Sequence, residues 1–309
     1  MKIIHLCPSN IATGGTESIH NLIYHLNMVG ADAKILYVGN AENPQPIEYA
    51  KYKCNYLTEL PDGFKGVVIF PEIWGNRVLE PQYKDCIPAI HWQGVDVYDW
   101  CTPKDQRNLF LQRKNVIHIT NLEYGMDHLR KLGLTPIKVS DALNDDFFKP
   151  YKEESRSDIV LYNPTNVKLT QFQKDVMAVC KARGIEFKPI QGYSRAELID
   201  LMRHSKLYID FGVFSGRERL PREAVMCGCC ILTSKLGAAG YYRDNSIKDF
   251  YKMDNINTAI EMILYVLEYY DRCRLDFDET RRLLIRDKNN YLSEVENLYN
   301  AFLSYNSNL

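Results

Sequence analysis

The feature that most constrains the fold is a regular alternation of short apolar segments with segments of helical periodicity. It continues along the whole chain and is typical of α/β domains built on parallel sheets. Between Gly15 and Gly30, apolar residues recur at helical spacing, which predicts a helix with one face on a sheet. Five strands are expected in this half, at residues 3–7, 33–39, 66–72, 87–92 and 116–120.

The same pattern restarts after a polar stretch at residues 141–157, which has no sustained periodicity. Four more strands are expected, at residues 158–164, 184–190, 206–212 and 229–234. A length of 309 residues suits two domains. We therefore expect two Rossmann-like domains, residues 1–150 and 151–309, each with a doubly wound parallel sheet. The final helices could pack back on the first domain.

Local signals place several helix starts in the second half. Ser194 and Glu197 form a capping box, as do Ser293 and Glu296, and Pro221 suits a first helical turn. Two doubly wound domains are expected to face a shared cleft, where ligands bind at the carboxyl ends of the strands. The informative motifs should therefore follow strands, and they do.

Charge argues against a nucleic-acid partner. The chain has 38 basic and 39 acidic residues, with no block of like charge. A charged substrate must then be held by a local site. The opening MKIIHLCPSN has a strand pattern rather than that of a signal peptide, and no apolar run is long enough to span a membrane. We expect a cytoplasmic protein, with peripheral attachment to the inner face of the membrane still open.

The sequence offers two patterns that resemble metal sites. Cys227 and Cys230 have C-x-x-C spacing without a second ligand pair, so we interpret them as a helix end running into a buried strand. The nine cysteines are expected to be reduced. Asp276 and Asp278 have D-x-D spacing but lie among helical segments, so we expect them to face solvent. No metal or other cofactor is expected.

The first motif that carries chemistry is Gly14-Gly15-Thr16-Glu17, between the first strand and the first helix. Glycines let the backbone approach a ligand closely, and a helix start offers free N–H groups to a phosphate or sugar oxygen. A plain glycine turn before a helix has the same pattern. The dinucleotide fingerprint G-x-G-x-x-G is not complete here.

The second motif is SGRERLPREAVMCGCC, residues 215–230, which follows a strand. Arg217, Arg219 and Arg222 lie at an expected helix start, where arginine forks suit phosphate oxygens. Glu223 is placed in the first helical turn, where its carboxylate could accept hydrogen bonds from ribose hydroxyls. The alternative interpretation is a solvated helix face.

Two further strand ends carry candidates. Asn163 and Lys168 follow the first strand of the second domain, where the lysine could reach a diphosphate or simply be an exposed loop residue. His91 ends a strand of the first domain and could face the cleft or be a satisfied core histidine. Glu72, at the end of the preceding strand, is a weaker candidate of the same kind.

Together these segments resemble the large GT-B family of retaining glycosyltransferases. The resemblance rests on GGTE, on SRAELIDLMRHSKLYIDFG and on REAVMCGCCILTS, and ITNLEYGMDHLRKLGL also fits. It implies that Glu223 holds the nucleotide ribose and Lys168 the donor diphosphate. It further implies that the loop at Gly14 and Gly15 contacts donor or acceptor, and that His91 lies near the transferred sugar.

The sequence departs from that family at one position. The first glutamate of the family's pair should stand at Ser215, and Glu218 is nearby in a different register. Because that glutamate contacts the donor sugar, the identity of the sugar is open. A subgroup with the pattern Gly-Arg/Lys-Glu/Asp-Arg-x-Pro-Arg-Glu-Ala, found among surface-polysaccharide enzymes, resembles this chain more closely.

The expected activity is transfer of a sugar from a UDP- or GDP-type donor to a glycan, lipid-linked or protein acceptor. Negative charge grows on the leaving phosphate, and fixed cations there lower the barrier. Lys168 and one or more of Arg217, Arg219 and Arg222 are the candidates, without a metal. The resemblance suggests retention at the anomeric carbon. A sugar-nucleotide epimerase of the same fold and a non-catalytic partner subunit are the alternatives.

Overall fold

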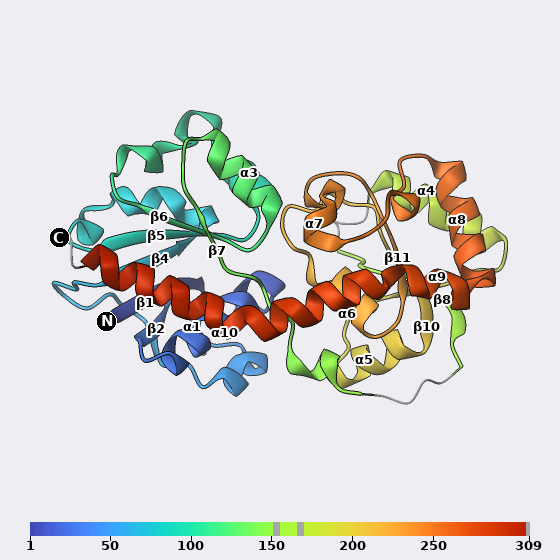
Figure 1. The fold of residues 1–309 in the computed structure, drawn as a ribbon, viewed down its shortest axis with the longest axis horizontal. Coiled ribbons are helices and arrows are strands. Elements are labelled where there is room, and N and C mark those ends of the chain that lie inside the picture. The colour runs from blue at the N-terminus through green and yellow to red at the C-terminus, as the bar shows by residue number, and fades with distance from the viewer. Residues whose placement is uncertain (151–154, 166–169, 307–309) are drawn as a thin grey trace. The chain divides into compact units, whose positions relative to one another are not determined.

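A computed structural model describes residues 1–150, 155–165 and 170–306 (Figure 1). The chain divides into two compact units. Unit 1 comprises Met1–Asp141 together with Asn289–Leu309, and unit 2 comprises Ala142–Lys288. The division after Asp141 thus falls nine residues before the boundary expected after Pro150, and the end of the last helix is counted with unit 1.

Unit 1 contains a seven-stranded parallel sheet with the order β3-β2-β1-β4-β5-β6-β7. The five expected strands are confirmed to within about one residue at each end, while two short edge strands were not expected. Alternation along β1 places Ile4 and Leu6 in one buried cluster and directs His5 to the opposite face. The strands are β1 (Lys2–Pro8), β2 (Asp32–Val38), β3 (Tyr56–Leu57), β4 (Val67–Pro71), β5 (Ile87–Trp92), β6 (Ile117–Thr120) and β7 (Ile137–Lys138).

The helices of unit 1 connect these strands. Three are α-helices: α1 (Gly14–Met28), α2 (Val95–Cys101) and α3 (Glu123–Lys131). In α1 the apolar face predicted from the sequence is confirmed, since its isoleucines and leucines are buried. The 3₁₀ helices are η1 (Ile47–Tyr52), η2 (Glu72–Leu79), η3 (Pro81–Tyr83), η4 (Lys104–Gln106) and η5 (Leu109–Gln112).

Unit 2 is built on a four-stranded parallel sheet with the order β11-β10-β8-β9. Its strands are β8 (Ser157–Tyr162), β9 (Glu186–Pro189), β10 (Ser205–Asp210) and β11 (Cys230–Thr233), as expected to within two residues. Its α-helices are α4 (Gln171–Ala182), α5 (Arg195–Arg203), α6 (Arg219–Met226), α7 (Tyr242–Asn245), α8 (Ile256–Glu268) and α9 (Tyr270–Cys273). The 3₁₀ helices are η6 (Asp145–Phe148), η7 (Ala238–Gly240), η8 (Asp249–Tyr251) and η9 (Arg274–Phe277).

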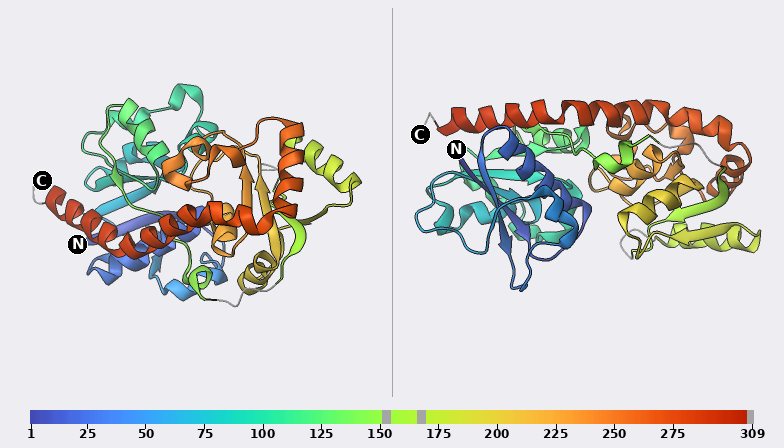
Figure 2. Two further views of the ribbon diagram at one scale, coloured as in Figure 1. Left: turned by 45° about the vertical axis from the view of Figure 1, so that its right-hand side comes forward. Right: turned by 90° about the horizontal axis from the view of Figure 1, so that it is seen from below.

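The predicted helix starts have mixed outcomes. Ser194 caps α5 in a complete capping box, and Pro221 is the third residue of α6, so both predictions are confirmed. The box at Ser293 is wrong, because α10 (Asp278–Asn306) is one continuous helix (Figure 2). Inside it the Ser293 hydroxyl donates to Asn290 O at 2.8 Å, as a mid-helix serine can.

The two metal-like patterns have structural explanations. Cys227 is the C-cap of α6 and Cys230 begins β11, both buried, as predicted, and burial raises the pKa of Cys227 to about 12. Asp278 is exposed as expected, but Asp276 is half-buried and bound by Lys248 and Tyr251. Across the described residues, no group of His, Cys, Asp or Glu is arranged to hold a metal ion. Within the same residues, no helix is both long and apolar enough to cross a membrane.

Candidate functional site

Each sheet has one position where the strand order reverses. In unit 1 the chain moves outward from β1 through β2 and β3, then continues on the other side from β4, so the reversal lies between β1 and β4. In unit 2 it lies between β8 and β10. Ligands of doubly wound sheets bind outside the carboxyl ends of the strands at such switch points. The candidate motifs follow β1, β8 and β10, and His91 is the last residue but one of β5, which lies beside β4.

At the switch point of unit 1, α1 begins with two exposed glycines. Thr13 caps the helix: its hydroxyl accepts from Thr16 N, and the Thr16 hydroxyl accepts from Thr13 N at 3.0 Å. A Cβ on Gly15 would lie 2.8 Å from Gln93 Oε1. Glycine at this position therefore lets the Gln93 amide lie against the start of α1.

The other two residues of the GGTE motif are buried. The Thr16 hydroxyl donates to Ile11 O at 2.8 Å, and the Glu17 carboxylate accepts from Lys51 and Tyr52 at 2.8 and 3.0 Å. These contacts hold the preceding loop and η1 against α1. Of the four residues, only Gly14 and Gly15 present their backbone at the surface.

His91 is a buried, neutral histidine with a defined tautomer. His5 Nδ1 must donate to Leu6 O at 2.8 Å, because a carbonyl only accepts, so His5 Nε2 accepts from His91 Nδ1 at 3.2 Å. Burial lowers the pKa of His91 to about 4, although Asp141 opposes the shift. The described residues give His91 Nε2 no hydrogen-bond partner, so this nitrogen is available as an acceptor.

Glu72 connects the ends of β4 and β5. It is 6% exposed, and its carboxylate accepts from Gly94 N at 3.0 Å and from Gln93 N at 3.3 Å. Burial raises the pKa of Glu72 to about 7, and these two backbone donors only partly offset it. Glu72 therefore fixes the turn that carries Gln93 toward Gly15 and His91.

Gln93 was not singled out from the sequence. Its amide nitrogen lies 3.5 Å from His91 Nδ1, and its oxygen lies against Gly15. The signal that could have found it is its position directly after a buried strand and before a helix, where side chains reach the carboxyl edge.

At the switch point of unit 2, the loop after β8 carries Asn163. Its side-chain oxygen accepts from Thr165 N at 3.1 Å, which closes a short turn. Lys168, the candidate cation of this loop, lies outside the described residues.

Two of the three arginines after β10 hold the fold of their own loop. The Arg217 side chain is 3% exposed and forms an ion pair with Asp287 at 2.5 Å, while its Nε donates to Asp244 O at 3.1 Å. Arg222 donates to Glu218 O and Arg217 O at 3.0 and 2.7 Å. These guanidinium groups are committed to protein partners.

Of the remaining charged residues after β10, Glu218 and Glu223 lie near a buried tyrosine, Tyr208. Arg219 is the first residue of α6 and is mostly buried. Burial raises the pKa of Tyr208 well above its usual value, and nearby Asp210, Glu218 and Glu223 raise it further. Glu223 is the fifth residue of α6, so its predicted place in the first turn is wrong. The helix dipole acts mainly within the first turn and gives Glu223 little support.

Several solved structures share the fold of this chain over nearly their whole length. A glycosyltransferase from Rickettsia africae is 13% identical, with 98% of both chains covered and a TM-score of 0.68. HepE from Anabaena, solved with UDP-glucose, is 11% identical over 99% of this chain and 100% of that one, with a TM-score of 0.68. The chain has the GT-B fold. WaaG, a glycosyltransferase involved in lipopolysaccharide biosynthesis, is 11% identical over 98% of this chain and 99% of that one, with a TM-score of 0.61.

The GT-B likeness is one of fold at low sequence identity. No protein-family model matches the sequence, and no curated protein matches it. The predicted fold class, two Rossmann-like doubly wound domains, is confirmed. In this GT-B chain Ser215 is buried in the loop after β10, so the charge of the glutamate expected from the resemblance is replaced by a hydroxyl.

Proposed function

We propose that this protein is a glycosyltransferase that moves a sugar from a nucleotide-diphosphate sugar to an acceptor hydroxyl. The observation that carries the proposal is the correspondence of both units, end to end, with glycosyltransferases of the same fold, one of them solved with UDP-glucose. The candidate residues at the two switch points support it, because they offer the polar contacts that a nucleotide and a sugar require.

The nucleoside diphosphate of the donor is assigned to unit 2. Glu223 would accept hydrogen bonds from the ribose, with Glu218 beside it, while Asn163 and Lys168 approach the diphosphate from the loop after β8. Arg219, at the start of α6, is our candidate for a cation beside the phosphates. Because Arg217 and Arg222 are committed to the loop, we assign them to holding that loop in place and no longer to direct contact with the donor.

The transferred sugar and the acceptor are assigned to unit 1. The N–H groups of Gly14 and Gly15 would donate to ligand oxygens, and His91 Nε2 would accept from a sugar hydroxyl. The bond from the anomeric carbon to the diphosphate oxygen breaks, and a bond to the acceptor oxygen forms. With retention, the leaving phosphate takes the acceptor's proton. The acceptor would be a glycan, lipid-linked or protein hydroxyl, reached in the cytoplasm or at the inner membrane face.

A donor screen tests this proposal. The full chain is incubated with UDP- and GDP-sugars, and release of the nucleoside diphosphate is measured with and without glycan or glycolipid acceptors. We expect release from one donor, with turnover that persists in EDTA because the cations are side chains. Loss of turnover in EDTA that manganese restores would contradict the metal-free mechanism. The absence of both binding and release for every donor would contradict the assignment as a whole.

A non-catalytic partner subunit is the second candidate. It is favoured by one observation: Arg217 and Arg222 are bound within the fold, and Ser215 supplies no charge, so fewer groups remain to stabilise a leaving diphosphate. The same screen separates the two, because a partner subunit would bind a nucleotide without releasing sugar from any donor. Addition of candidate acceptors would not change that result.

A further inference from the structure

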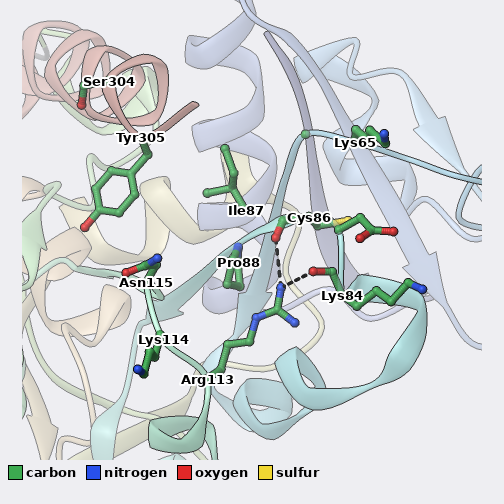
Figure 3. Close-up of a pocket in the computed structure, with 12 residues that line it drawn as sticks. Lys65, Lys84, Cys86, Ile87, Pro88, Arg113, Lys114, Asn115, Ser304 and Tyr305 are labelled. Atoms are coloured by element: carbon green, nitrogen blue, oxygen red, sulfur yellow. Dashed lines mark hydrogen bonds between the residues drawn. The ribbon is translucent and has the colours of Figure 1, made fainter. Parts of the chain in front are cut away.

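Unit 1 has a second polar feature, at the edge of the sheet opposite to the switch point. A pocket of about 900 Å³ lies beside the amino ends of β4 and β5 (Figure 3). Lys65 and Gly66 precede β4, and residues 84–86 precede β5. Ligands that react at a doubly wound sheet bind at the carboxyl ends of its strands, so this pocket is separate from the reaction edge of unit 1.

The pocket is strongly cationic. Four of its lining residues are basic, namely Lys65, Lys84, Arg113 and Lys114, and Asp85 is its one acidic residue. The net charge of the lining is therefore three positive. The three lysines are exposed, and none of them forms an ion pair with a described residue. In a chain whose charges otherwise nearly cancel, this local excess is a feature that an anion would recognise.

Arg113 fixes one of these charges in place. Its terminal nitrogens donate to the carbonyls of Val78, Tyr83, Lys84 and Cys86 at 2.9–3.3 Å. Figure 3 shows the guanidinium held between the Lys84 and Cys86 carbonyls. Because these donors are already engaged, Arg113 adds a fixed positive charge to the pocket, and the exposed lysines are left to contact an anion directly.

The rest of the lining suits an organic group attached to the anion. Ile87 and Pro88 give an apolar surface, and the ring of Tyr305, from the last turns of α10, lies toward Asn115 (Figure 3). Asn115 and Ser304 add neutral hydrogen-bonding groups. A bare inorganic ion would leave most of a 900 Å³ pocket unfilled.

We propose that this pocket binds a phosphate ester or diphosphate group and is a second, non-reacting anion site of the protein. A phosphate monoester carries about 1.5 to 2 negative charges at neutral pH, which matches a lining with several cations better than a single carboxylate does. A phosphodiester headgroup carries one such charge, and a membrane surface presents many of them together. The group can come from a soluble phosphorylated compound or from a phospholipid headgroup. Both sources carry the phosphate group that the lysines would contact, in the positive field to which Arg113 adds.

Inorganic pyrophosphate tests the soluble source. Its affinity is measured by calorimetry, with saturating UDP occupying the proposed donor site, on the full chain, on the double variant Lys84→Gln/Lys114→Gln, and on the matched control Lys104→Gln/Lys131→Gln. The control removes two exposed lysines of unit 1 that do not line the pocket. Because two cations are lost from the site, we expect binding about tenfold weaker in the first variant alone.

Sedimentation with vesicles tests the lipid source, using phosphatidylglycerol against phosphatidylcholine and the same two variants. Loss of pyrophosphate affinity or of phosphatidylglycerol binding in the pocket variant alone supports the proposal and identifies the source. Equal effects in the pocket variant and the control, or no binding in either arm, would overturn it. Affinity for UDP should be unchanged in both variants, and a selective fall in the pocket variant would contradict a separate site.

Discussion

The switch points of the two sheets differ in the charge of the residues that form them. In unit 1 the edge is formed by two glycines, a neutral histidine and an amide, with the carboxylate of Glu72 buried beneath them. In unit 2 the loop after β10 is dense in charge, yet Arg217 and Arg222 are bound to protein partners. The comparison teaches that conspicuous charge in a sequence can serve the fold, whereas inconspicuous residues remain open to a ligand.

The largest effect that distinguishes the two edges is expected at Arg217. Arg217→Ala leaves the Asp287 carboxylate without its buried partner, which typically costs about 3–5 kcal/mol. We expect the free energy of unfolding of unit 2 to fall by that amount in a denaturant titration. The control is Arg286→Ala, which removes an exposed arginine of α10, the helix that carries Asp287. It should change the free energy of unfolding by less than about 0.5 kcal/mol. If Arg217→Ala is instead as stable as the wild type but has lost nucleotide affinity, Arg217 contacts the donor directly, as the sequence predicted.

The next effect concerns pH and the buried carboxyl group of unit 1. Folded Glu72 keeps its proton up to a pKa of about 7, against 4.5 for an ordinary glutamate, so the folded state binds more protons between these values. Stability therefore falls as pH rises from 4.5 to 7, by roughly 3 kcal/mol at most. His91 acts in the opposite direction, because its folded pKa is lowered to about 4.

Glu72→Gln isolates this contribution. The glutamine cannot titrate, so the stability of the wild type relative to the variant should decline through that pH window. Denaturant titrations of both proteins at pH 5, 6, 7 and 8 measure the difference. A constant difference across the series would show that the Glu72 carboxyl is not shifted.

The sequence predicts the strands that lead to both switch points better than it predicts the contacts of the polar side chains there. Strands that are buried on both faces are continuous apolar runs and were found, while β3 and β7, with two residues each, carry too little pattern. The partner of Arg217 could not be predicted, because Asp287 is brought to it only by the packing of α10. The start of α6 was misplaced because Glu218 stands at its N-cap without a side-chain capping bond.

In unit 2, Glu223 provides the sharper test of ligand binding. Glu223→Gln keeps the shape but removes the charge and one acceptor for the ribose hydroxyls. A charge-assisted hydrogen bond contributes roughly 1.5–3 kcal/mol, so nucleotide affinity should fall by about one to two factors of ten. Calorimetry with UDP and GDP on the folded variant measures this, with Glu197→Gln, an exposed capping residue of α5, as the control. Unchanged affinity would leave Glu223 as a residue of the fold.

The smallest expected effect is at Gly15, in unit 1. The Cβ of Gly15→Ala would lie 2.8 Å from Gln93 Oε1, the end of a flexible side chain, so the fold should adjust at little cost in stability. The amide would then move away from its place beside His91, and the methyl group would cover part of the helix start. We expect kcat/KM for sugar transfer to fall about tenfold, which corresponds to about 1.4 kcal/mol. The double variant Gly15→Ala/Gln93→Ala removes the collision but not the methyl group. If it recovers wild-type turnover, Gly15 serves only to make room for Gln93, and the backbone of α1 does not contact the ligand.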